Sequence, residues 1–416
     1  MPYLVIQSSK PGTTMPINNV PISSTKSSHS SVFSLVKEKQ EEMPSDKGGV
    51  AARGKVKSYD YFAPGFGIIR SMKAGLVYDP VYLEHDTGSH PENSRRLAAI
   101  ISHLEESGTK ERLTLLSPRP ASVEELEMVH APEYVSQVKS KAEKGGGWLD
   151  PDTIMCPKSY EVASYAVGGL LTAVEAVMKG KVSSAFALVR PPGHHATSNR
   201  AMGFCIFNNV AVAAKFALAN FNIARALIAD FDVHHGNGTQ EVFYANPEIL
   251  YFSTHQYPFY PGTGWSNETG SGQGEGTTVN FPMTAGWGDI EYLRAFHEVL
   301  VPIARRFQPQ LILVSAGFDP HWADSIATMQ VSITGFAQMV TVLRNLAAEL
   351  CQGHLVLTLE GGYNLQVVAS AVRATFDVLS ECPEVVDPLG KSSNESPGGF
   401  EEHIEKIKET HHLLKP

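Results

Sequence analysis

Two carboxylates and a histidine in this chain stand at spacings that suit a shared metal ion. Asp232 and His234 follow the apolar run 226–229, which reads as a buried strand. At an extended strand end, residues two apart point to one side, so this carboxylate and imidazole can bind one cation. Asp319 comes just after a second apolar run, 311–317, and is the third candidate ligand. Two carboxylates and one imidazole neutralise a divalent zinc and leave one coordination position open for water.

Two further blocks carry groups that could move protons or stabilise charge. His194 and His195 follow the rigid turn 191–193, and their side chains could occupy two positions around a reacting water. Tyr363 comes just past the apolar run 355–359, behind two glycines that permit a mobile loop. A phenol in that place could donate a hydrogen bond to a developing oxyanion.

Short apolar runs alternate with amphipathic segments from Met72 onward. The apolar runs predict strands at 75–78, 185–189, 226–229, 249–252, 311–314 and 355–359. Helical periodicity predicts helices at 94–106, 160–178, 209–219, 290–306, 334–351 and 365–379. This alternation predicts an α/β fold, a mostly parallel sheet with helices on both faces. Because each candidate block follows a strand, we expect the blocks to meet at the carboxyl edge of the sheet.

Taken together, four blocks resemble the histone deacetylase family of zinc-dependent amide hydrolases, closer to its class II and bacterial members than to class I. They are residues 190–196, 230–240, 315–319 and 359–364, in the family's order. The resemblance extends from about Met72 to about Leu379. It implies the arginase/deacetylase three-layer fold, one zinc ion per chain, and hydrolysis of the acetyl amide of N-acetyl-lysine in proteins.

The resemblance also implies roles for the residues around the metal. His195 would be the general base and then the acid to the leaving amine, while His194 would assist electrostatically. Asp230 matches the family's partner for His194. The partner of His195 is Asn237 here, as in class II members, whereas class I members carry aspartate. Tyr363 would be the oxyanion donor.

The substrate channel of the family can be matched in the same way. Phe204 and Tyr260 would clamp an aliphatic side chain between two rings, and Tyr260 replaces a more usual phenylalanine. Gly203 matches a backbone acceptor for the substrate amide. Ile326 stands where polyamine-selective members carry an acidic gatekeeper, which argues against polyamine selectivity. Asp324 lies two residues away, so the alignment of this loop with the family leaves open which of the two residues stands at the gatekeeper position.

A monovalent-cation site of the family, which would hold potassium, is also matched. Its residues are Asp230, Asp232, His234, Ser253 and Thr254.

Other functions fit the sequence less well. A two-metal ureohydrolase of the same fold needs a carboxylate where Gly236 stands. A non-catalytic binder of acetylated ligands would tolerate loss of the metal ligands or of Tyr363, and all of them are present. Deacetylation of small acetylated amines such as acetylpolyamines stays open as the alternative to protein substrates.

Composition bounds the class of protein. The 416 residues are 43% hydrophobic and 19% charged, as in ordinary soluble proteins, and suffice for one large α/β domain. The net charge of -9 argues against direct nucleic-acid binding. Four scattered cysteines indicate a reducing compartment, and no apolar run approaches the ~20 residues of a membrane span. We expect a cytoplasmic protein, with an organelle or the nucleus as alternatives, and leave the oligomeric state open.

Three segments differ in composition. Residues 1–71 are rich in Ser, Thr, Pro and Lys and lack a persistent period, so we expect a disordered N-terminal extension. A targeting sequence and a mis-assigned start, with Met72 as the true one, are the alternatives. Residues 72–382 form the expected catalytic domain. Residues 383–416 are expected to be a loose polar tail, apart from a short helix near 401–414.

Overall fold

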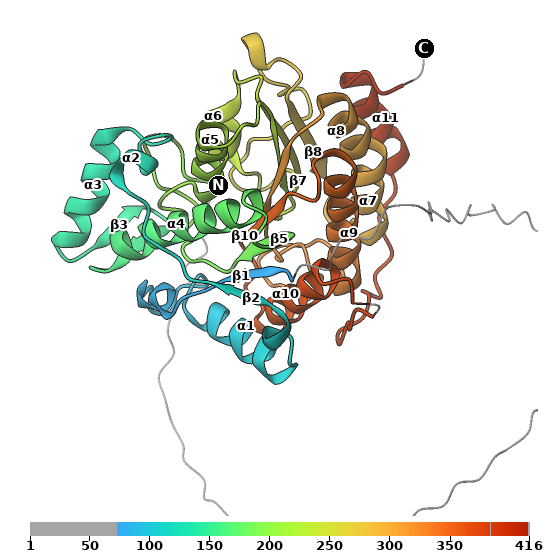
Figure 1. The fold of residues 1–416 in the computed structure, drawn as a ribbon. Coiled ribbons are helices and arrows are strands. Elements are labelled where there is room, and N and C mark those ends of the chain that lie inside the picture. The colour runs from blue at the N-terminus through green and yellow to red at the C-terminus, as the bar shows by residue number, and fades with distance from the viewer. Residues whose placement is uncertain (1–72, 383, 415–416) are drawn as a thin grey trace, which may run out of the picture. The chain divides into compact units, whose positions relative to one another are not determined.

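The computed structural model describes residues 73–382 and 384–414, so the expected N-terminal extension, 1–71, lies outside the described residues (Figure 1). Its centre is an eight-stranded sheet in the order β2-β1-β5-β10-β9-β6-β7-β8, and every neighbouring pair is parallel. The strands are β1 (Gly75–Val77), β2 (Thr114–Leu116), β5 (Ser184–Ala187), β6 (Ala226–Asp230), β7 (Ile249–Gln256), β8 (Thr278–Met283), β9 (Leu311–Ala316) and β10 (Leu355–Leu359).

Helices cover both faces of this sheet, which confirms the three-layer α/β prediction (Figure 1). One layer consists of α4 (Ser159–Met178), α5 (Asn209–Asn220) and α6 (Asn237–Phe243). The other contains α1 (Arg95–Glu106), α7 (Asp289–Ala295), α9 (Ile333–Leu350) and α10 (Leu365–Leu379). Because the sheet is covered twice, every residue of β6, β9 and β10 is buried, and these strands are mostly apolar, with one polar residue each.

Several elements carry too weak a pattern to be predicted. The edge strands β2 and β8 are short or mix polar residues into the run. A two-stranded antiparallel hairpin, β3 (Gly147–Asp150) and β4 (Thr153–Met155), lies apart from the main sheet. The remaining elements outside the prediction are η1 (Pro80–Glu84), η2 (Lys110–Arg112), α3 (Pro132–Glu143) and η3 (Gly272–Gly274). At the start of α2 (Val123–Leu126), Ser122 and Glu125 form the capping box that their spacing indicates.

The helix predicted at 290–306 is divided in three. After α7, the chain forms a π-helical turn, η4 (Phe296–Leu300), and then α8 (Val301–Phe307). Pro302, in the first turn of α8, has no N–H to donate to the preceding turn, and its ring crowds the carbonyl four residues earlier. This accounts for the irregular turn directly before it.

Within the segment 383–416, expected to be a loose tail apart from a short helix near 401–414, the helix is present and is docked on the domain. Helix α11 (Phe400–Thr410) buries Phe400, Ile404 and Ile407. Its Lys408 ammonium lies 2.5 Å from a Glu298 carboxylate oxygen, so an ion pair joins α11 to η4. These three apolar side chains recur at helical spacing and so form one apolar face, which packs against the domain.

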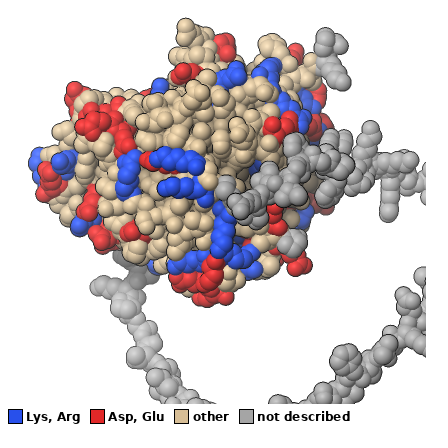
Figure 2. All heavy atoms as spheres, in the orientation of Figure 1, with Lys and Arg blue, Asp and Glu red and all other residues tan. Residues whose placement is uncertain are grey.

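One described helix, α4, has the length and apolar composition of a membrane span. However, 72% of its most apolar window is buried inside the protein, as is usual for the core helix of an α/β domain. On the face drawn in Figure 2, Lys and Arg side chains lie beside Asp and Glu side chains, with uncharged surface between them.

Candidate active site

The loops that follow four strands bring the predicted residues together at the carboxyl edge of the sheet. These residues are His194 and His195 after β5, Asp232 and His234 after β6, Asp319 after β9, and Tyr363 after β10. Strand β6 pairs with β9, so Asp230 lies opposite Ser315, and the residues beyond both strand ends face one space. The strand order therefore explains why blocks far apart in the sequence form one site.

Asp232, His234 and Asp319 form a compact set of donor atoms. One ligand atom of each lies within 4.8 Å of the other two, and all three residues are buried. The Asp319 Oδ2 atom is buried and meets the geometry of no hydrogen bond, although His234 Nδ1 lies 3.3 Å away, while its other oxygen accepts from the Val233 amide at 3.0 Å. An orphaned carboxylate oxygen among further oxygen and nitrogen donors is what a divalent cation such as zinc fits.

The charge balance of this set points the same way. Burial and the neighbouring charge of Asp232 raise the pKa of Asp319 to about 6, although His234 offsets part of the effect. His234 Nδ1 lies 3.0 Å from Asp232 Oδ1 and 3.3 Å from Asp319 Oδ2. Two buried carboxylates thus face one imidazole, and a bound cation would balance the second charge.

The two vicinal histidines have different partners, as the sequence predicts. His194 Nδ1 lies 3.0 Å from Asp230 Oδ2, and His195 Nδ1 lies 2.8 Å from Asn237 Oδ1. Burial lowers the pKa of His194, but the charges of Asp230 and Asp232 outweigh it and raise that pKa to about 10. Burial and the neighbouring His194 and His234 charges instead hold the pKa of His195 well below its usual value. The pKa values of the two rings are therefore shifted in opposite directions, toward the cationic form in His194 and toward the neutral form in His195.

The orientation of His195 leaves one ring nitrogen available. Because the Asn237 oxygen accepts from Nδ1, that nitrogen carries the proton and Nε2 is a free acceptor. The Asn237 amide nitrogen approaches the His195 carbonyl at 3.4 Å, which fits this orientation. A neutral imidazole with a free Nε2 can accept a proton.

The Tyr363 phenol lies at the same site. Its ring meets Phe204 edge to face, with centroids 5.9 Å apart, and the Arg96 guanidinium lies 5.0 Å from its centroid. Burial raises the pKa of Tyr363 well above its usual value, so the hydroxyl keeps its proton and can donate it in a hydrogen bond.

The glycines before Tyr363 allow close approach here. The Gly361 amide donates to Asp232 Oδ2 at 2.8 Å, and its carbonyl accepts from the Phe318 amide at 3.1 Å. A Cβ at Gly361 would lie 2.3 Å from Asp319 Oδ2, so no other residue could bring the backbone this near the candidate ligands. The two glycines permit a mobile loop, but in this structure Gly361 is hydrogen-bonded both to Asp232 and to the Phe318 backbone.

A narrow cavity of about 170 Å³ leads to these groups. It is lined by Asp152, Pro192, His194, His195, Gly203, Phe204, His234, Tyr260, Gly361 and Tyr363. A wider hollow of about 570 Å³, around the end of α6, contains none of the candidate residues. The predicted channel residues Gly203, Phe204 and Tyr260 are therefore brought together with the catalytic candidates.

The cavity walls are fixed by contacts that the sequence did not reveal. Asp152, on the β3–β4 hairpin, accepts from the Gly203 amide at 2.9 Å and helps to raise the pKa of the Tyr260 hydroxyl. Gly203 packs so closely that a Cβ would lie 2.2 Å from His195 Cδ2. The next residue, Phe204, holds a left-handed φ of 69°, a strained conformation that turns its ring into the wall.

Ile326, the predicted gatekeeper, does not lie at the cavity. It is partly buried against the hydrophobic core and is not among the described residues that line the cavity. Asp324, the other candidate for this place, is 4% exposed and accepts hydrogen bonds from backbone amides. Neither residue contributes to the cavity wall in this structure.

Ser253 and Thr254 lie beside the site on β7. Register places Ser253 opposite Asp230, and the Thr254 hydroxyl is buried without a hydrogen-bond partner. The monovalent-cation site at these residues stays a prediction.

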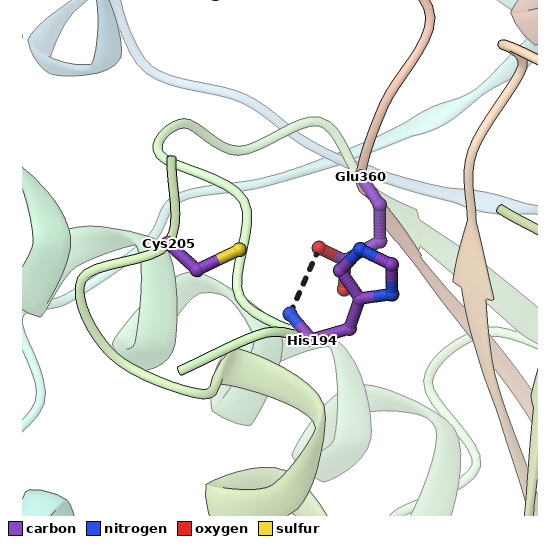
Figure 3. A group of neighbouring side chains, drawn as sticks. All are labelled: His194, Cys205 and Glu360. Carbon is purple, nitrogen blue, oxygen red and sulfur yellow. Dashed lines mark hydrogen bonds between the residues drawn. The ribbon is translucent and has the colours of Figure 1, made fainter. Parts of the chain in front are cut away.

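A second group of donor atoms, His194, Cys205 and Glu360, lies next to the site (Figure 3). The Glu360 carboxylate accepts from the Gly193 amide at 2.6 Å, the His194 amide at 3.3 Å and the Ser315 hydroxyl at 3.0 Å. Burial raises the pKa of the Cys205 thiol well above its usual value, so it stays protonated. We therefore interpret this group as a hydrogen-bonded support for the histidine turn rather than a metal site.

Comparison with known proteins agrees with the fold and with this site. Residues 90–379 match the histone deacetylase domain, which is most of the chain, and the chain belongs to the histone deacetylase family. A probable deacetylase of Archaeoglobus fulgidus is 38% identical, over 82% of this chain and 98% of the relative. Histone deacetylase 10, chloroplastic, of Oryza sativa is 38% identical over 79% of each chain.

Among solved structures, the HDA15 HD domain superimposes with a TM-score of 0.75 at 35% identity, covering 82% of this chain and 94% of that one. The arginase/deacetylase fold predicted from the sequence is consistent with this match. The protein is a histone deacetylase-like hydrolase.

Proposed function

We propose that the protein is a zinc-dependent deacetylase that hydrolyses the acetyl amide of N-acetyl-lysine in proteins. The observation that carries the proposal is the convergence of Asp232, His234, Asp319, His195 and Tyr363 at the end of a narrow, aromatic-walled cavity. Metal donors, a neutral base and a hydroxyl donor around one point suffice for amide hydrolysis.

The residues divide the chemistry among them. A zinc ion held by Asp232, His234 and Asp319 would supply a Lewis acid for the acetyl carbonyl and the attacking water. His195 takes a proton from the water at Nε2 and then gives it to the leaving amine. Tyr363 donates its hydroxyl hydrogen to the oxygen on which negative charge develops.

The second histidine supports this sequence electrostatically. His194, whose pKa is raised to about 10 mainly by the charges of Asp230 and Asp232 against the effect of burial, stays cationic. A fixed positive charge beside His195 stabilises negative charge that forms on the substrate. The Asp230 carboxylate orients the His194 ring through its 3.0 Å contact.

The shape of the cavity supports a lysine-like side chain. Phe204 and Tyr260 form its walls, and a volume of about 170 Å³ admits a single aliphatic stem with an acetyl cap. Gly203 offers a backbone carbonyl to the substrate amide.

A small acetylated amine is the second candidate, and Asp152 favours it. Burial raises the pKa of this carboxyl, but hydrogen bonds from neighbours that include Gly203 and Tyr260 outweigh it, so the pKa is lowered overall. An ionised carboxylate in the cavity wall could pair with a second ammonium of a polyamine.

Profiling the purified protein on an acetyl-lysine peptide, acetylspermidine and a neutral N-acetyl amide tests the proposal. We expect the peptide to have the highest kcat/KM. A native enzyme markedly better on acetylspermidine would refute the protein-lysine proposal.

Two further parts of the proposal concern the surroundings of the enzyme. We propose potassium as the ion of the monovalent-cation site that the resemblance matches to Asp230, Asp232, His234, Ser253 and Thr254. We propose that the protein is cytoplasmic. The alternative, an organellar location, is supported by the rice relative, whose name includes "chloroplastic".

A further inference from the structure

A buried carboxylate outside the proposed chemistry holds the backbone that carries Tyr363. Asp324 Oδ2 accepts a hydrogen bond from the Tyr363 amide at 2.6 Å and from the Asn364 amide at 2.8 Å. Its other oxygen accepts from the Ile326 amide at 3.1 Å. At 4% exposure, these charge-assisted bonds are shielded from competing water.

The Asn364 side chain also joins this loop to the segment that carries Asp324. Its Nδ2 donates to the Ala323 carbonyl at 2.8 Å, while its Oδ1 caps α10 by accepting from the Gln366 and Val367 amides. Tyr363 therefore lies between two fixed elements, the loop that follows Asp319 and the first turn of α10. Movement of the Tyr363 backbone would therefore break its hydrogen bond to Asp324.

We propose that Asp324 is a positioning residue that sets where the Tyr363 hydroxyl lies relative to the candidate metal ligands. The inference rests on the proposed function, in which Tyr363 donates to the oxyanion. Asp324 fixes the tyrosine backbone, and Phe204 and Arg96 pack on its ring. With ring and backbone both held, the carboxylate determines the direction in which the hydroxyl points.

The geometry explains why aspartate stands here rather than asparagine. Both carboxylate oxygens already accept from backbone N–H groups, so an amide NH₂ in either position faces another donor. Asp324→Asn can keep its bonds to Tyr363 and Asn364 only by turning the NH₂ toward the Ile326 amide. It should therefore restore part of what Asp324→Ala loses.

The test is a double-mutant cycle on an acetyl-lysine peptide, with kcat, KM, zinc content and melting temperature measured for each protein. Asp324→Ala should lower kcat by roughly 10- to 100-fold, because a misplacement near 1 Å costs up to about 10² in rate. KM and zinc content should stay near the parent values, and Asp324→Asn should lose less. In a Tyr363→Phe background there is no hydroxyl left to position, so Asp324→Ala should lower kcat by less than about two-fold. A difference of that size is within the deviation from additivity that is usual for independent substitutions.

Asp387→Ala is the matched control. Asp387 also accepts backbone hydrogen bonds, from Thr334 at 3.1 Å and Gly390 at 2.7 Å, but it lies outside the site. It should lower the melting temperature and leave kcat unchanged. If Asp324→Ala fails to fold, Asp324→Asn carries the cycle.

Three outcomes would count against the account. An equal loss in both backgrounds, or an unchanged kcat in Asp324→Ala and Asp324→Asn, would overturn the positioning role alone. An unchanged kcat in Tyr363→Phe would overturn the oxyanion role of Tyr363 and the positioning role with it.

Discussion

Two buried clusters of charge lie at the carboxyl edge of the sheet, and they differ in what neutralises them. In the first, Glu92 is met by two arginines: Arg190 Nε lies 2.5 Å and Arg96 Nη1 3.2 Å from its Oε1. Burial alone would raise the pKa of Glu92, but the arginines outweigh it and lower that pKa to about 2. This charge is balanced inside the protein.

In the second cluster, the His234 imidazole lies against both Asp232 and Asp319, and the His194 ring lies 3.8 Å from Asp232 but also faces Asp230. Burial and the charge of Asp232 raise the pKa of Asp319 to about 6. One oxygen of Asp319 accepts no hydrogen bond. The two clusters are equally buried, so burial alone does not separate structure from function. The difference is that the second supplies more negative charge than its protein neighbours balance, as a cation-binding site does.

Breaking the second cluster should have the largest effect on activity. Asp319→Ala removes one of two carboxylates, so we expect both zinc binding and turnover to fall below detection. Metal analysis of the purified variant, alongside turnover of an acetyl-lysine peptide, checks this. A variant with normal zinc content and normal turnover would remove Asp319 from the ligand set.

Changes beside the metal ligands should uncouple turnover from metal binding. Tyr363→Phe should lower kcat by on the order of 10²–10³, the effect of losing one oxyanion donor. His195→Ala should cost on the order of 10²–10⁴, as expected for a proton carrier. Zinc content and melting temperature should be retained in both. Loss of zinc in either variant would assign that residue to metal binding instead.

Breaking the first cluster should affect stability. Glu92→Gln leaves two buried arginines without their anion, and we expect a loss of about 3–5 kcal/mol in the free energy of unfolding. Zinc content per folded chain should stay near the parent value. Denaturant unfolding of both proteins measures the difference, and a Glu92→Gln variant as stable as the parent would contradict the structural role.

The same pair of proteins gives a pH test with a definite sign. The folded pKa of Glu92, about 2, lies below its ordinary value of 4.5. Its contribution is therefore fully present above about pH 4.5 and is lost as the pH falls toward about 2. The stability difference between the parent and Glu92→Gln should shrink across that window. A difference that stays constant there would show that Glu92 is not the group responsible.

The sequence predicted those parts of the fold and site that produce local patterns. Buried parallel strands such as β6 and β10 read as apolar runs, and each candidate block stands directly after one, so their meeting at one edge could be foreseen. Asp232 and His234 converge as their Asp-x-His spacing predicts, but they lie in a bend beyond β6, which ends at Asp230, and not on an extended strand.

The remaining parts depend on contacts between segments far apart in the chain. Arg96 donates to the Glu360 and Gly362 carbonyls across more than 260 residues, and nothing in its own neighbourhood indicates this. Asp152 joins the channel because an antiparallel hairpin brings it to Gly203. The i,i+4 spacing of Glu92 and Arg96 was a usable signal for an ion pair, but not for its burial.

Metal titration of the purified protein tests the central claim most directly. After removal of metal by a chelator, zinc is added back in steps while turnover of an acetyl-lysine peptide is followed. We predict negligible turnover without metal and recovery that saturates at about one zinc per chain, the stoichiometry of a three-ligand catalytic site. Full turnover in the metal-stripped protein, or saturation at one zinc with no turnover of any acetylated substrate, would contradict the account.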